Sequence, residues 1–222
     1  MLIKYPRTVH LPWSGCITSD DKLLKSTVHF EGKQVVVSVK MDGEQTTLYR
    51  DYVHARSLDS RNHYSRNWVR NLHGQIGYRI PIGWRICGEN LYAKHNIHYH
   101  NLKSYFVVFS IWNENNVCLS WADTKIWCAL LNLQSVSVLY KGVYDEERIS
   151  TFDILAKNNG DEVEGYVVRL AGAFNYVDFK QSVAKYVKVE FREGLKDQVN
   201  WIHQQIIPND LGGCIEGELC KT

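Results

Sequence analysis

The sequence predicts a single α+β domain built around an antiparallel or mixed β-sheet. Short apolar, aromatic and β-branched runs alternate with turns rich in Asn and Lys, which is typical of strands. A few longer segments carry apolar residues at helical spacing, and the 222-residue chain shows no repeat, low-complexity tract or clear linker. Hydrophobic residues at 45% and charged residues at 23% indicate a folded globular protein that can bury a sizeable core.

The N-terminal half begins with an extended lead-in that has a turn or short helix near residues 20–25. Residues 35–52 are predicted to form a hairpin around Asp42-Gly43, a dipeptide common in tight turns. The polar stretch 57–80 is predicted to hold a loop and a short helix. Four apolar residues lie near helical spacing in it, namely Trp68, Val69, Leu72 and Ile76.

The remaining elements are predicted from the two-residue alternation of strands and the 3.6-residue spacing of helices. Strands are expected at residues 83–92, 105–113, 117–121, 135–140, 163–171 and 186–191. Helices are expected at residues 121–133, beginning near Ala122 or Asp123, at 145–159 and around 199–207. Residues 1–192 are taken as the domain and residues 193–222 as a tail packed on it.

Lys40 ends the apolar strand that begins at Val35. Alternation puts Val35, Val37 and Val39 on one face and Val36, Ser38 and Lys40 on the other. Burial disfavours the charged form of an amine, so Lys40 is a candidate for a neutral, nucleophilic lysine. The alternative is a solvated lysine that blunts the mouth of a hairpin.

Other charged residues also interrupt apolar strands, where a charge is costly unless a partner or ligand meets it: Glu89, Glu164, Lys185 and Lys188. Together with Lys40 they suit one kind of reaction. A lysine attacks an α-phosphate, a divalent cation and positive side chains neutralise the phosphates, and a carboxylate binds the ribose hydroxyls.

Five motifs occur in an informative order: KMDG at 40–43, GENLY at 88–92, YFVVFSIW at 105–112, EGYVV at 164–168 and AKYVKV at 184–189. Their order and rough spacing resemble those of the covalent nucleotidyltransferases, which include ATP-dependent RNA ligases, DNA ligases and messenger-RNA capping enzymes. The likeness covers about residues 35–190 and is greatest to small RNA-ligase-family proteins of bacteria and phages. It implies an ATP-grasp-like nucleotidyltransferase domain of β-sheets flanked by helices, and it favours the catalytic interpretation of Lys40.

The resemblance implies a role for each matching residue. Lys40 would form the bond to AMP, and Lys185 and Lys188 would bind the α-phosphate and promote adenylation. The nucleotide-binding residues would be Asp42, Gly43, Arg56 for phosphate, Glu89 for ribose and Phe109 for adenine, and Glu164 would serve metal and phosphate chemistry. Purely structural roles stay open for these residues. Arg56 would then be a surface arginine, Phe109 a core residue, and Lys185 and Lys188 solvated residues at a sheet edge.

Three departures from the family pattern narrow the expectations. Gln45 replaces the arginine of DNA ligases and is closer to the asparagine of RNA ligases, and Ser110 stands where many relatives have aspartate. Lys185 and Lys188 are separated by two residues, so a regular strand would send them to opposite faces. We therefore expect Lys185 to precede its strand or to lie at a bulge.

Two further clusters allow competing interpretations. His95, His98 and His100 do not share one face by simple spacing and lack a completing local ligand, which favours a structural or surface role over a metal site. Arg56, Arg61, Arg66 and Arg70, interleaved with aromatic residues, are either a surface for a nucleic-acid strand or a solvated helix face.

The resulting functional prediction is an ATP-dependent RNA ligase acting in RNA repair with ATP and Mg²⁺ or Mn²⁺. Its substrates would be 5′-phosphate and 3′-hydroxyl RNA ends, with DNA as an open alternative and a protein partner for end recognition also open. A capping-type guanylyltransferase and a binding module without ligation activity are the rivals. About 30 residues after Lys188 are too few for a separate OB domain.

The net charge and the cysteine pattern are compatible with this prediction but are not specific to it. The net charge of +2 and pI near 8.1 neither require nor exclude a polynucleotide partner. The six cysteines form no CxxC pair, and no signal-like or membrane-spanning apolar run is present, so a cytoplasmic protein with free thiols is expected.

Overall fold

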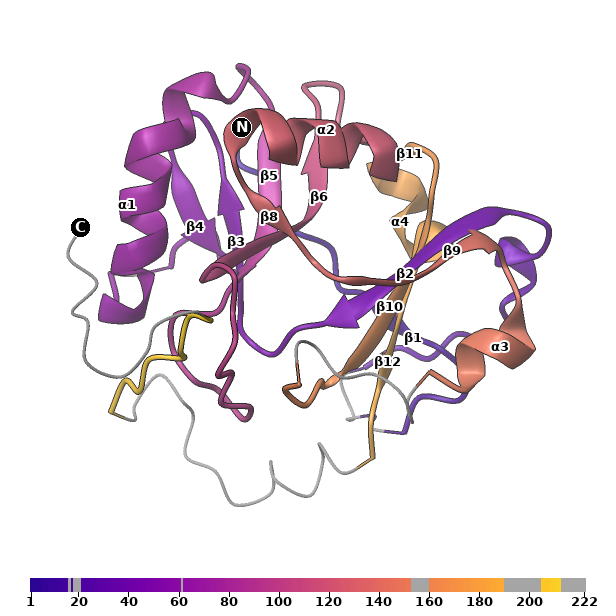
Figure 1. The fold of residues 1–222 in the computed structure, drawn as a ribbon. Helices are drawn as coiled ribbons and strands as arrows, with labels where there is room; N and C mark the ends of the chain where they lie inside the picture. Colours follow the sequence, from indigo (N-terminus) through magenta and orange to yellow (C-terminus); the bar gives the residue numbers. More distant parts are fainter. Residues whose placement is uncertain (16, 18–20, 61, 153–159, 190–204, 213–222) are drawn as a thin grey trace.

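The computed structural model describes residues 1–222 except 16, 18–20, 61, 153–159, 190–204 and 213–222. Two β-sheets form the centre of the molecule, and short helices lie against them (Figure 1). This arrangement confirms the predicted α+β class.

The first sheet, sheet A, carries the strand that ends at Lys40 near its middle. Its neighbours are antiparallel except for the outer pair β1/β12, which is parallel. In spatial order its strands are β1 (Val9–His10), β12 (Val183–Val187), β10 (Gly165–Leu170), β2 (Gln34–Lys40) and β9 (Val138–Val143).

The second sheet, sheet B, is antiparallel apart from β8 (Gln134–Ser135), which pairs in parallel with β6. In spatial order its main strands are β11 (Phe174–Asn175), β7 (Val117–Cys118), β6 (Phe106–Trp112), β5 (Arg85–Asn90), β3 (Glu44–Leu48) and β4 (Val53–Ala55).

Helices α1 (Asn67–Ile76) and α2 (Trp121–Leu131) share an apolar cluster with strands of sheet B, and α3 (Glu146–Ser150) contributes Ile149 to a cluster on sheet A. Ser120 caps α2 by accepting a hydrogen bond from the Asp123 amide at 3.1 Å, so the helix starts slightly before the predicted point. The remaining short elements are η1 (Val28–Phe30), η2 (Tyr64–Arg66), η3 (Gly77–Arg79), η4 (Tyr176–Asp178) and α4 (Phe179–Ser182).

The predicted hairpin at residues 35–52 is wrong. Strands β2 and β3 do not pair: β2 lies between β9 and β10 in sheet A, whereas β3 pairs with β4 and β5 in sheet B. The Asp42-Gly43 turn therefore carries the chain from one sheet to the other. Because β2 is buried on both faces, it pairs with distant strands on each side, which a local turn signal cannot reveal.

Two smaller expectations also need correction. Val39 packs in the cluster that holds Val36, not in the one that holds Val35 and Val37. The last strand covers 183–187 instead of 186–191, so Lys185 lies inside it and not before it. The predicted tail helix falls largely on residues outside the described part of the chain.

Three cysteines in the described ranges, Cys87, Cys118 and Cys128, are buried free thiols. Among the described helices, none is long and apolar enough to cross a membrane, and α2, the longest, has 11 residues.

Candidate active site

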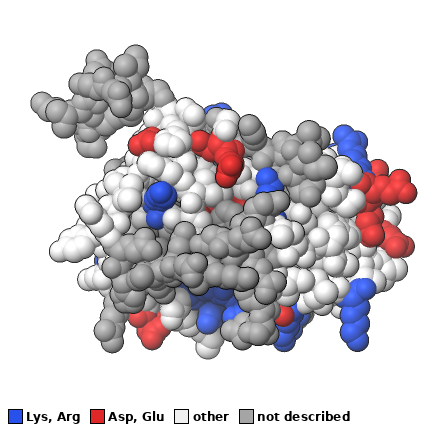
Figure 2. All heavy atoms as spheres, turned by 90° about the horizontal axis from the view of Figure 1, so that it is seen from below, with Lys and Arg blue, Asp and Glu red and all other residues white. Residues whose placement is uncertain are grey.

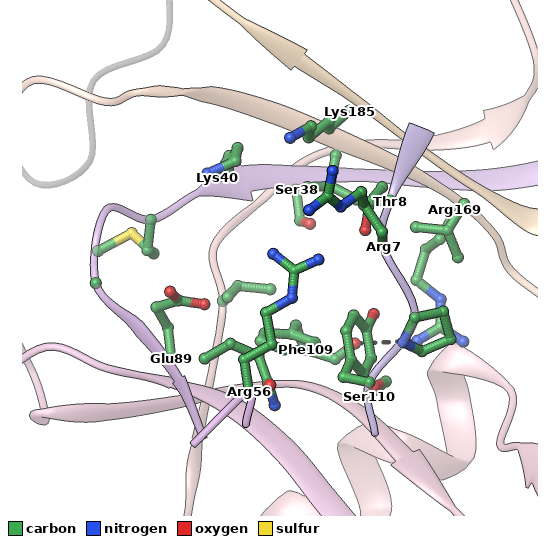
Figure 3. A pocket seen from close by; sticks show the side chains of 18 of the residues that line it. Arg7, Thr8, Ser38, Lys40, Arg56, Glu89, Phe109, Ser110, Arg169 and Lys185 are labelled. Carbon is green, nitrogen blue, oxygen red and sulfur yellow. Dashed lines mark hydrogen bonds between the residues drawn. The ribbon is translucent and has the colours of Figure 1, made fainter. Parts of the chain in front are cut away.

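A pocket of about 570 Å³ opens between the two sheets, a volume suited to a small-molecule ligand. Six of the nine predicted site residues line it: Lys40, Gly43, Arg56, Glu89, Phe109 and Lys185. Figure 3 shows the side chains of Lys40 and Lys185 from sheet A and those of Arg56, Glu89 and Phe109 from the sheet B side around one space.

Sheet A supplies one wall through the register of its strands. Ser38 on β2 lies opposite Val167 on β10, which lies opposite Lys185 on β12, and all three line the pocket. Further along β2, Lys40 lies opposite Gly165 of β10. Glu164, which precedes Gly165, therefore lies close enough to form an ion pair with the Lys40 amine. Strand pairing thus gathers groups that are more than 120 residues apart in the sequence.

Sheet B supplies the facing wall, and a β-bulge shapes it. Cys87 pairs with Ser110 while Gly88 pairs with Val108, so Phe109 is an extra residue in β6. As a result Phe109 and Ser110, although consecutive, both line the pocket. The buried Arg169 of β10 donates to the Phe109 carbonyl at 3.1 Å, which ties this bulge to sheet A.

Lys40 forms an ion pair with Glu164, and the two side chains are only 22% and 13% exposed. Burial alone would lower the pKa of Lys40. The carboxylates of Glu164, Glu89 and Asp42 together raise this pKa by more than burial lowers it, so the net shift is upward. The amine is therefore held protonated in the ligand-free protein. This corrects the expectation that burial alone would leave Lys40 neutral.

The carboxylates around Lys40 outnumber the amine. Burial raises the pKa of Glu89 to about 8, and the Glu164 and Asp42 charges add to this rise although Lys40 opposes it. Burial also raises the pKa of Glu164 despite its ion pair with Lys40. Burial thus favours the protonated form of both carboxyl groups, and a cation beside them would favour their ionised form.

The two predicted basic residues after Glu164 differ in their placement. Lys185 lines the pocket and lies 3.5 Å from Asp21, and burial lowers its pKa, with the Lys40 charge adding to the effect. Lys188 follows the end of β12, where its backbone amide donates to the Glu164 carbonyl at 3.0 Å. Lys188 is not among the residues that line the pocket.

Asp42 and Gly43 shape the turn between the sheets. The Asp42 carboxylate is buried and accepts hydrogen bonds from the Asn96 and Ile97 amides at 2.7 and 2.9 Å. At Gly43 a Cβ atom would lie 2.7 Å from the Asn90 carbonyl oxygen, so only glycine lets the turn pack this closely on β5. Asp42 therefore fixes the loop that follows Lys40 and does not line the pocket.

The geometry can be compared with known proteins. A sequence profile of the RNA ligase family matches residues 33–187, a range that includes Lys40, Glu89 and Lys185. The chain belongs to the RNA ligase family.

Solved structures of Naegleria gruberi RNA ligase show the same fold at low identity. A mutant in its apo form has 19% identity and a TM-score of 0.56, with 78% of this chain and 54% of that chain covered. The protein with PPi has 16% identity and a TM-score of 0.57, with 89% and 64% covered, and a mutant with ATP and Mn has 16% and 0.57, with 88% and 63% covered. This chain thus spans less than two thirds of those chains, and none of the curated proteins searched matches it.

Two pocket residues of this RNA ligase-family chain escaped the sequence prediction. Arg7, from the lead-in, extends into the pocket beside Arg56 (Figure 3). Nothing in the local sequence marks it, because tertiary packing alone brings the lead-in to the site. Arg169 had a usable signal, since it is a charge within the apolar strand YVVRL, as Lys40 is in its own strand.

The predicted arginine surface does not form as a unit. Arg66 is buried and its Nε donates to Glu44 at 2.7 Å, so it fastens η2 to β3. Arg56 belongs to the pocket, and Arg61 lies outside the described residues. On the face in Figure 2, acidic and basic side chains are interspersed among the described residues.

Proposed function

We propose that this protein is an ATP-dependent polynucleotide ligase that joins RNA ends through a lysyl-AMP intermediate. The observation that carries the proposal is the position of Lys40. Lys40 ends β2, an interior strand of sheet A, and its amine lies beside Glu164 at a pocket that Glu89, Phe109 and Arg56 complete from the sheet B side. A buried amine that faces a nucleotide-sized pocket suits nucleophilic catalysis.

In the proposed first step, the Lys40 amine loses a proton and attacks the α-phosphorus of ATP. A phosphorus–nitrogen bond forms, the bond to the bridging oxygen breaks, and pyrophosphate leaves. A 5′-phosphate oxygen of RNA then attacks the same phosphorus, which frees the lysine. Finally a 3′-hydroxyl attacks the activated 5′-phosphate, and AMP leaves as the phosphodiester bond forms.

The pocket offers a partner for each part of the nucleotide. Glu89 would bind the ribose hydroxyls, and Phe109, which packs edge-on against Tyr5 with ring centroids 5.1 Å apart, would contact the adenine. Arg56 and Lys185 would neutralise phosphate oxygens. Lys188 remains a predicted catalytic residue outside the pocket lining.

The carboxylates beside Lys40 fit a divalent cation. Glu164 would provide an oxygen ligand of the kind that Mg²⁺ or Mn²⁺ prefers, and the cation would favour the ionised form of this buried carboxyl group. When bound, the cation supplies positive charge that stabilises phosphate oxygens and lowers the pKa of the Lys40 amine.

We place this activity in the cytoplasm, where ATP is present and the buried thiols stay reduced.

Intact-protein mass spectrometry tests the first step. Wild-type protein, Lys40→Ala and the control Lys141→Ala are stripped of bound adenylate with pyrophosphate and then incubated with ATP or GTP and Mg²⁺. Lys141 is an exposed lysine of the same sheet. We expect an AMP-sized gain from ATP in wild type and control, its absence in Lys40→Ala, and its loss on adding pyrophosphate.

Each rival function predicts a different result. A GMP-sized gain would indicate a capping-type guanylyltransferase. Nucleotide binding without any covalent gain would overturn the ligase mechanism and leave a binding module. If the AMP adduct forms, transfer to 5′-phosphorylated RNA and DNA strands, single, nicked or splinted, identifies the acceptor.

A further inference from the structure

A second cluster of polar side chains lies among residues that do not line the pocket. His98 Nε2 and His100 Nδ1 are 3.4 and 2.9 Å from the same oxygen of Asp210, Oδ2. The three ligand atoms all lie within 4.8 Å of one another. The structure thus brings a carboxylate from the C-terminal segment to two histidines that lack a local partner in the sequence.

The two histidines share a side because Tyr99 between them points inward. Tyr99 is fully buried and its hydroxyl accepts the Asp42 amide at 2.9 Å, whereas the rings of His98 and His100 lie 4.4 Å apart. His98 Nε2 is itself buried and makes no hydrogen bond. His98 Nε2 is therefore a buried polar atom without a hydrogen bond, and it lies beside the Asp210 carboxylate.

The backbone around the cluster is held in place before any ligand binds. The Asp210 amide donates to the Tyr99 carbonyl at 2.8 Å, and the Tyr99 amide donates to the buried side chain of Asn209 at 2.9 Å. The His100 amide donates to the Asp161 carboxylate at 3.1 Å. Fixed backbone on both sides reduces the ordering cost of binding at this position.

The spacing of the ligand atoms fits a small cation with bonds of about 2.1 Å. Tetrahedral ligands at that bond length lie about 3.4 Å apart, which matches the 3.4 Å between His98 and Asp210, whereas His100 and Asp210, hydrogen-bonded at 2.9 Å, would move slightly apart. Two imidazoles and one carboxylate suit Zn²⁺, Co²⁺ or Ni²⁺ better than Mg²⁺, which prefers oxygen ligands alone. Three protein ligands leave a further coordination position for water.

We propose that His98, His100 and Asp210 form a binding site for one transition-metal cation of the Zn²⁺ type. The bound ion joins the described C-terminal segment, residues 205–212, to the loop that contains Tyr99. The Tyr99 hydroxyl accepts a hydrogen bond from the Asp42 amide, so an ion that fixes the Tyr99 loop also stabilises the turn after Lys40. The site is separate from the proposed cation position at Glu164.

Cobalt spectroscopy tests the proposal. Metal-free protein without a polyhistidine tag is titrated with Co²⁺ while its visible absorption bands are recorded. We expect one Co²⁺ per chain, displaced by an equimolar amount of Zn²⁺ but not by excess Mg²⁺. Zn²⁺ should also raise the Tm of the wild-type protein.

Conservative variants separate this site from other metal-binding groups. His98→Gln, His100→Gln and Asp210→Asn should each weaken Co²⁺ binding at least ~10-fold and remove the Zn²⁺ effect on Tm, with unchanged circular dichroism. His29→Gln, a control histidine elsewhere, and Glu164→Gln should keep the Co²⁺ bands. Absence of Co²⁺ bands in the wild type, or equal affinity in the three variants, would overturn the proposal.

Discussion

At the scale of single residues, the charge state of Lys40 would decide when the proposed nucleophile is available. The ligand-free site holds the amine protonated, because Glu164 and Glu89 outweigh the effect of burial. In the proposed reaction, substrate and cation would therefore have to change the local charge before the amine attacks.

Glu164→Gln should shift the pH profile of adenylation. It removes the largest contribution that raises the pKa of Lys40, so that pKa falls relative to wild type and the neutral amine forms at lower pH. The midpoint of the rise in single-turnover adduct formation should move to lower pH, even if the plateau rate falls. Glu147→Gln, an exposed carboxylate on α3, should keep the wild-type midpoint, and an unshifted midpoint in Glu164→Gln would contradict the assignment.

Glu89 should make the stability of the protein depend on pH. Burial raises its pKa from 4.5 to about 8, so between these values the folded state binds a proton that the unfolded chain has released. The free energy of unfolding therefore falls as pH rises through this window and levels off above it. Glu89→Gln should be more stable than wild type above pH 8, by on the order of 1 kcal/mol, and equal to it below pH 4.5.

Urea unfolding at a series of pH values measures this difference. Glu162→Gln provides the control, since Glu162 is exposed. A constant difference between Glu89→Gln and wild type at all pH values would mean that folding does not change the pKa of Glu89, and the prediction would fail.

At the scale of elements, the sequence predicted most strands and both longer helices because their signals are local. The apolar spacing of Trp68, Val69, Leu72 and Ile76 identified α1, and the apolar runs identified β5, β6 and β10. Strand partners were not predictable in the same way. Asp42-Gly43 has the composition of a hairpin turn, yet the buried strand β2 pairs with β9 and β10, whose positions depend on the whole chain.

The described C-terminal segment, 205–212, should contribute to the stability of the domain through Asn209. Its buried amide donates to the Leu91 carbonyl at 2.7 Å and accepts the Tyr99 amide at 2.9 Å. Asn209→Ala leaves both backbone groups without these partners and should lower the free energy of unfolding by about 2 kcal/mol or more. The exposed Asn115→Ala should change it by less than ~0.5 kcal/mol in the same urea titration. A neutral Asn209→Ala would show that the segment does not belong to the cooperative unit.

At the scale of the whole molecule, the site exists only where the two sheets meet. Alternation and family motifs placed Lys40, Glu89 and Lys185 correctly at the pocket. They could not predict Arg7, which reaches the pocket from the lead-in, or the burial of Arg66, whose partner Glu44 lies on another element. Both outcomes depend on contacts between segments far apart in the chain.

A nucleotide that contacts both sheets should stabilise them as one unit. Free ligand at 100 times its Kd adds about 2.7 kcal/mol to the stability of the state that binds it. Lys40→Ala, which cannot form the adduct, allows this to be measured with ATP and Mg²⁺ by hydrogen exchange. Protection should rise in β2, β10 and β12 of sheet A and also in β5 and β6 of sheet B, because pocket residues lie on or beside all five strands. GTP at the same concentration is the control for base selectivity. Protection confined to one sheet would mean that the nucleotide binds a single wall, and the proposed contacts of Glu89 and Phe109 with ribose and adenine would then be wrong.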